Sequence, residues 1–166
     1  MKISNSLRLA VVLSTIIGLT ALQHNSAFAS DGMEIIKSPT KVKWGAVPPN
    51  LPRGGQLAVI SGDASKAGTV YTLRLKMPDG YKFSPHWHPQ DVYVTVISGT
   101  LGIGMGDKFD RTKGELVKTG GFIREPSKMH HYAWTQGPTV IQVYGEGPFV
   151  MNYVNPSDDP STTRHR

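Results

Sequence analysis

Two closely spaced pairs of histidines are the residues of this sequence best suited to chemistry. His86 and His88 are separated by one residue, and His130 and His131 are adjacent. Residues two apart in a β-strand point to the same face, so His86 and His88 would present their imidazoles side by side. A third nitrogen from a distant strand would complete a facial ligand set of the kind used by non-haem iron and other divalent metals. The pattern therefore predicts a metal site.

Other chemistries find less support in the sequence. It contains no cysteine, which excludes disulfides, thiolate nucleophiles, cysteine-type zinc sites and iron–sulfur clusters. It also contains no G-x-S-x-G elbow of a serine hydrolase. No sequence pattern brings two of the acids Glu115, Glu125 and Glu146 together, as a glycosidase would require. A metal would therefore be held by histidine and oxygen ligands.

Glycines alternate with larger residues in the segment 102–106. This segment lacks the spacing of a phosphate-binding glycine loop, and no helical pattern follows it. We interpret it as a strand whose inner face is bare glycine, which would leave cavity space opposite Leu101, Ile103 and Met105.

The elements that must position the histidines are short strands. From Gln56 onward, apolar or alternating runs are separated by Gly, Pro, Asp or Asn, which is typical of an all-β sandwich or barrel. We predict strands at 56–61, 69–77, 91–97, 100–106, 121–125, 131–135, 139–145 and 149–154. Strands of this number and length suit a small double-sheet roll.

The first 29 residues have the pattern of a secretory signal peptide. Lys2 and Arg8 precede an apolar run over 9–22, and Ala27-Phe28-Ala29 provides a cleavage site. The run is shorter than the roughly 20 residues that cross a bilayer, which disfavours the alternative of an uncleaved membrane anchor. We therefore expect an exported protein, periplasmic or secreted, with no membrane contact after cleavage.

The remaining chain divides into three predicted parts. Residues 30–55 are rich in proline and glycine and form an N-terminal arm, with a short strand at 41–44. Residues 56–157 form the β domain. Residues 158–166 have no aliphatic or aromatic side chain and are predicted to be a disordered tail.

The net charge and the distribution of the basic residues argue against nucleic acid as a partner. The formal charge is +6, and loss of the cations Lys2 and Arg8, with no acid, leaves +4 after signal cleavage. The basic residues are scattered and are not interleaved with exposed aromatic residues as a strand-binding groove requires. The expected partner is a small-molecule ligand or substrate.

Two segments resemble the two motifs of the cupin superfamily. The first is Gly80–Val92 followed by Gly99, and the second is Gly120–His131. The positions that match are Gly80, His86, His88, Gly99, Gly120, Pro126 and His131. The resemblance covers roughly residues 56–154. It implies an all-β, cupin-like double-stranded β-helix, a small barrel or jelly roll, with a metal held inside.

The resemblance also implies which residues bind the metal. His86 and His88 would be ligands from the first motif and His131 from the second, whereas the side chain of His130 would point the opposite way. Val92 occupies the position of the family's glutamate ligand, and strand alternation places Val92 on the inner face. Two further positions also depart from the motifs: Lys128 and Thr135.

The missing carboxylate affects the expected ligand. Three neutral imidazoles leave the charge of a dication uncompensated, so we expect an anionic or chelating small molecule to supply the balance. Iron is the first candidate metal, and manganese, zinc, copper and nickel also accept imidazole. The alternative is a metal-free site in which the histidines only pack or form hydrogen bonds.

The signal pattern and the resemblance together imply an exported cupin-like metalloprotein that binds a small anionic or chelating molecule in its barrel, with non-haem metal-dependent dioxygenase activity as one outcome. A non-catalytic ligand-binding or sensing module is the alternative, and the sequence leaves catalysis undecided. Trp87, Tyr93, Tyr132 and Trp134 have the opposite strand parity to the histidines. We expect these rings on the outer face, where their apolar area would favour a homodimer.

Overall fold

Alternation of apolar and polar residues builds two antiparallel sheets. The computed structural model describes Ile36 and residues 38–162, so the predicted signal peptide and cleavage site lie outside the described residues. The first sheet has the order β1 (Gly45–Ala46), β2 (Gln56–Ser61), β3 (Val70–Met77), β10 (Thr139–Glu146), β5 (Val92–Ser98), β8 (Phe122–Glu125). The second has the order β11 (Asn152–Tyr153), β4 (Lys82–Trp87), β9 (His131–Thr135), β6 (Thr100–Met105), β7 (Glu115–Lys118).

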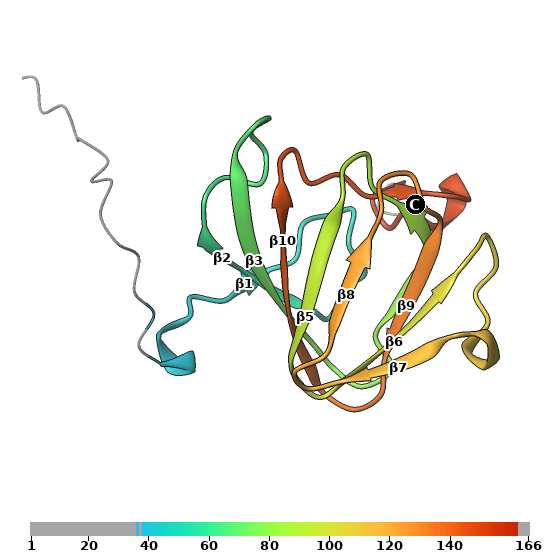
Figure 1. Cartoon of the computed structure of the whole chain (residues 1–166), viewed down its shortest axis with the longest axis horizontal. Helices are drawn as coiled ribbons and strands as arrows, with labels where there is room; N and C mark the ends of the chain where they lie inside the picture. Colours follow the sequence, from blue (N-terminus) through green and yellow to red (C-terminus); the bar gives the residue numbers. More distant parts are fainter. Residues whose placement is uncertain (1–35, 37, 163–166) are drawn as a thin grey trace, which may run out of the picture. The chain divides into compact units, whose positions relative to one another are not determined.

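The two sheets form the predicted all-β jelly roll (Figure 1). Three short 3₁₀ turns are also described: η1 (Pro39–Lys41), η2 (Arg111–Lys113) and η3 (Pro156–Asp158). In the part of the chain that the structure describes, no helix is long and apolar enough to cross a membrane. The predicted tail begins at the end of η3 with a turn in which the Thr162 amide donates to the Asp159 carbonyl, and residues 163–166 lie outside the described residues.

The short strand predicted at 41–44 is wrong, because Lys41 ends η1 and β1 begins only at Gly45. Strands β4 and β7 were not predicted from the sequence. Strand β4 contains Pro85, which cannot donate to the sheet ladder, and its pairing with β9 shifts register between Phe83 and His86. Strand β7 is a short edge strand without buried side chains, so its sequence has no core-facing alternation. The last predicted strand shrinks to β11 because residues 147–151 form a loop, held by the Phe149 amide donating to the Ala64 carbonyl.

The core lies between the inner faces of the two sheets. On β5 the predicted inner residues Val92, Val94 and Val96 are all buried. On β3 the buried residues alternate with half-buried or exposed polar ones in the same way. The inner faces thus define the interior into which a site residue must point.

The glycines of β6 face outward, so the prediction that they leave cavity space is wrong. Gly102 lies opposite Trp134 of β9, and Gly104 lies opposite Tyr132. A Cβ atom at Gly102 would lie 2.0 Å from the Trp134 ring, and one at Gly104 would lie 2.3 Å from the Tyr132 ring. The rings of β9 therefore fill the space above these glycines.

The same two rings are covered by their own chain. Tyr132 is 1% and Trp134 is 4% exposed, because the β6–β7 connection places Phe109 against both, with ring centroids 5.1 and 5.8 Å away. They lie on the outer face as expected, but both are almost fully buried. This observation removes one ground for expecting a homodimer.

The N-terminal arm joins the two sheets. Its strand β1 pairs with β2 at the edge of the first sheet. Beyond β1, the Tyr81 hydroxyl donates to the Pro52 carbonyl, and the Tyr153 hydroxyl donates to the Asn50 carbonyl at 2.9 Å. Between these contacts Leu51 is buried in the core. The arm therefore covers the interior beside β1, an edge strand of the first sheet, and β11, an edge strand of the second.

Candidate metal centre

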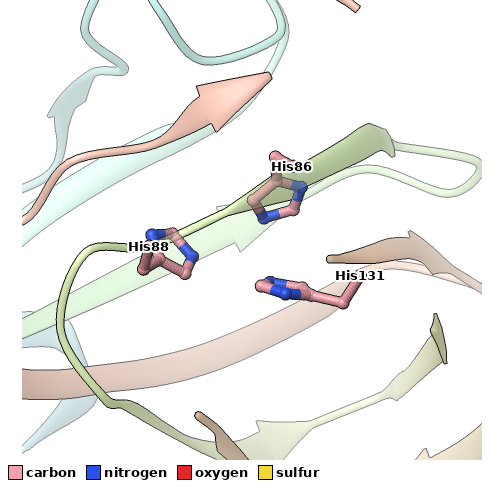
Figure 2. Close-up of side chains that lie close together, drawn as sticks. All are labelled: His86, His88 and His131. Carbon is pink, nitrogen blue, oxygen red and sulfur yellow. The ribbon is translucent and has the colours of Figure 1, made fainter. Parts of the chain in front are cut away.

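Three of the four histidines in the β region come together in the interior. His86 lies on β4, His88 directly follows β4, and His131 begins β9, where it is the register partner of His86. Each is 3% exposed, and one nitrogen of each lies within 4.8 Å of the others. Figure 2 shows the three imidazole rings turned toward a shared space. The fold thus joins the two histidine motifs in one cluster.

One hydrogen bond fixes the tautomer of each ring. The Nδ1 atoms of the three histidines contact backbone carbonyl oxygens, those of Ser84, Val150 and Met129, at 2.7, 2.7 and 2.9 Å, respectively. A carbonyl oxygen can only accept, so each Nδ1 of a neutral ring carries the proton. Each Nε2 then keeps a free lone pair, which is the state a metal ligand requires.

The donor set fits a metal ion. Among the described side chains, His131 Nε2 is buried without a hydrogen-bond partner. Buried polar atoms of this kind are rare, because they lose their hydration without compensation. A cation placed among the three Nε2 lone pairs would satisfy this atom together with the other two.

A carboxylate that the sequence reasoning missed stands beside the histidines. Glu125 ends β8 and is 8% exposed. Its Oε2 atom lies 3.6 Å from His88 Nε2 and 3.5 Å from His131 Nε2. Val92 lies on the inner face as predicted, but the inference that the site lacks a carboxylate is wrong. The available signal was the alternation in β8, where Phe122 and Arg124 are exposed and Glu125 is buried.

Burial sets the charge of these groups. It lowers the pKa of His86 well below its ordinary value, with the neighbouring histidines adding to the effect, and lowers the pKa of His88 to about 4. Burial also lowers the pKa of His131 and raises the pKa of Glu125 to about 8. The imidazoles are therefore neutral ligands at neutral pH. A nearby dication would favour the ionised form of Glu125.

A small apolar cavity adjoins the cluster. It has a volume of about 50 Å³ and is lined by aliphatic and aromatic side chains from both sheets, together with His86, His88 and Glu125. A single water needs roughly 10–15 Å³ measured in this way, so the space suits a few small groups. Its walls favour a ligand with an apolar body and a polar end directed at the histidines.

A model of the ChrR cupin-like domain family matches residues 33–150. The chain belongs to this family of cupins. No protein with a curated description matches the sequence.

Solved structures share the fold of this cupin. The polyketide cyclase RemF from Streptomyces resistomycificus has a TM-score of 0.63 and 19% identity, over 78% of this chain and 91% of that one. A proposed acetylacetone dioxygenase from Methylibium petroleiphilum PM1 has a TM-score of 0.56 and 16% identity, over 79% and 88%. An RmlC-like cupin from Shewanella frigidimarina has a TM-score of 0.51 and 8% identity, over 75% and 96%. At these identities the matches show the double-stranded β-helix fold alone.

The fourth histidine of the β region in this cupin lies outside the cluster. His130 Nδ1 lies 2.6 Å from the Asp107 carboxylate, and both side chains are exposed to solvent. Its neighbour His131 starts β9 and turns inward, so the two adjacent rings point to different environments.

Proposed function

We propose that this cupin is an exported metalloprotein that holds a divalent transition metal at His86, His88 and His131 and binds a small chelating molecule beside it. The observation that carries the proposal is the convergence of three buried imidazoles, with one nitrogen of each within 4.8 Å of the others. Each Nδ1 contacts a backbone carbonyl, which leaves each Nε2 free to bind a metal. Iron is the first candidate, and manganese, zinc, copper and nickel share the preference for imidazole. Export is inferred from the pattern of residues 1–29.

The surroundings of the site define the chemistry of the ligand. One ionised Glu125 beside a dication leaves one positive charge in an apolar cavity. A ligand that brings one negative charge through oxygen or sulfur, such as an enolate, a catecholate or a thiolate, would neutralise it. The cavity of about 50 Å³ favours the smallest of these, with a short apolar body. The enolate of a small β-diketone meets both conditions.

The protein's own residues would orient the ligand and exclude water. Apolar side chains surround the site, and a dry environment strengthens the attraction between the ligand and the charged centre. A bound metal would supply Lewis acidity toward a chelating oxygen and, where it is redox-active, electron exchange with dioxygen. We propose dioxygenase-type chemistry as the activity on this basis. A non-catalytic binding module is the second candidate, favoured by the small volume of the cavity.

One set of measurements separates these functions. Metal analysis of the purified protein is followed by oxygen-consumption and thermal-shift assays with acetylacetone, catechol and cysteamine. Metal-dependent oxygen uptake that His131→Ala abolishes would support an enzyme. Stabilisation by a probe without oxygen uptake would support a binding module. If added metal does not stabilise the wild-type protein, the proposed metal site is wrong.

A further inference from the structure

We propose that Glu125 is a fourth protein ligand of the metal, which moves the carboxylate of this cupin site from β5 to its neighbour strand β8. The inference rests on the proposed function, because it requires a metal at the three histidines. It adds a ligand from a position that the two histidine motifs do not assign to metal binding. It also accounts for the valine at position 92.

The strand register places Glu125 at the same corner as Val92. Strands β5 and β8 are antiparallel, and Val92 is the register partner of Glu125. Directly opposed residues of such a pair lie on the same face of the sheet, with Cβ atoms about 4.5–5.5 Å apart. Because Val92 faces the interior, Glu125 faces it too, and both line the cavity. A carboxylate on either strand can thus serve the same corner of the site.

The distances match donors that share an ion. Glu125 Oε2 lies 3.5 Å from His131 Nε2 and 3.6 Å from His88 Nε2. These separations exceed the roughly 2.7–3.2 Å of ordinary hydrogen bonds. Two donors bound tetrahedrally to one ion at about 2.0–2.2 Å are about 3.3–3.6 Å apart. The carboxylate therefore stands at the spacing of a ligand.

The surroundings of Glu125 provide no other partner for its charge. Among the described residues, no lysine or arginine pairs with its carboxylate, and its contacts with His88 and His131 are longer than ordinary hydrogen bonds. The adjacent Arg124 points to the outer face, where it contacts Asp91 at 2.7 Å. The ionised form of a buried carboxyl group is strongly disfavoured when no cation is near it. A metal at the three histidines would supply the positive charge that the ionised form of Glu125 needs.

Zn²⁺ is the probe for a test by mutation. We would measure the affinity of the purified protein for Zn²⁺ by chelator competition in wild type, Glu125→Gln, Val92→Glu with Glu125→Val, and the control Glu115→Gln on the exposed edge strand β7. Loss of an outer-shell partner typically lowers metal affinity 10- to 100-fold. Glu125→Gln should lower it by more than about 100-fold. The double variant should return the affinity to within about tenfold of wild type, and Glu115→Gln should leave it unchanged.

The outcomes separate this inference from the proposed function. If wild type binds Zn²⁺ and Glu125→Gln lowers the affinity by less than about 100-fold, Glu125 is not a ligand, although the histidine site stands. If wild type binds no metal, both fail. If the double variant does not fold, zinc X-ray absorption spectroscopy can compare the first coordination shell of the metal in wild type and in Glu125→Gln. Loss of one oxygen from the first coordination shell supports the inference, and identical shells overturn it.

Discussion

At the scale of single residues, the histidine site is prepared by backbone contacts. His86 and His131 each contact the carbonyl of the residue two positions earlier, so the local chain fixes both rings. His88 instead contacts the carbonyl of Val150, and its ring stacks on Phe149 at 5.2 Å between centroids. The third ring therefore depends on the loop after β10, and the site is complete only in the folded domain.

The first prediction concerns the four histidines. His86→Ala, His88→Ala and His131→Ala should each lower the affinity for Zn²⁺ by more than about 100-fold, because each removes a ligand instead of an outer-shell partner. His130→Ala is the matched control and should bind Zn²⁺ like wild type, since its ring pairs with Asp107 at the surface. Isothermal titration checks both. Equal losses in all four variants would contradict the assignment of His131.

At the scale of elements, the outer layer of the second sheet depends on glycine. The β6 glycines leave room for the rings of Tyr132 and Trp134 on β9, and Phe109 covers those rings. A side chain at position 102 would displace the Trp134 ring. Because β9 begins with His131, this packing also supports one side of the histidine cluster.

Gly102→Ala tests this packing. The added methyl would meet the Trp134 ring at 2.0 Å, so we expect a loss of about 1–3 kcal/mol or more in the free energy of unfolding. Gly45→Ala on β1 is the control, because its nearest neighbour would be the Leu57 carbonyl at 3.8 Å. Urea denaturation of both variants measures the difference. A Gly102→Ala protein as stable as Gly45→Ala would refute the packing.

The arm is the second element whose contribution can be measured. Leu51 is 2% exposed and lines the cavity, so Leu51→Ala should destabilise the protein by about 2–5 kcal/mol. Val59→Ala, at a residue 60% exposed, should change stability by no more than about 0.5 kcal/mol. Denaturant midpoints compare the two. Similar small effects would show that the arm does not close the core.

At the scale of the whole molecule, the described residues belong to one compact unit. The family match over residues 33–150 begins after the proposed signal peptide. One interior serves the fold and the site together, since residues that line the cavity also belong to the hydrophobic core. Loss of core packing would therefore also disturb the histidine cluster.

Export is the prediction at this scale. The apolar run behind Lys2 and Arg8, followed by Ala27-Phe28-Ala29, should direct cleavage after Ala29. Mass spectrometry of the protein from separated cell fractions should find Ser30 as the N-terminus, outside the cytoplasm. An intact Met1 on protein in the cytoplasmic fraction would show that the segment is not a signal peptide.

The sequence by itself determined the all-β fold and the residues of the histidine cluster. Alternation with period two is a local property, and the two motifs carry His86, His88 and His131 at fixed local spacings. The same local rule placed Val92 inward, as the structure confirms. These features needed no knowledge of which strands are neighbours.

Only the tertiary structure decided the rest of the site. Alternation shows that two faces exist, but it does not show which face meets the core or which strand lies alongside. The outward direction of Gly102 follows from its pairing with Trp134 on β9. The position of Glu125 follows from the register of β8 against β5, which brings it opposite Val92 from 33 residues away. A search for a carboxylate along the first motif alone misses Glu125, because Glu125 lies on the neighbouring strand β8.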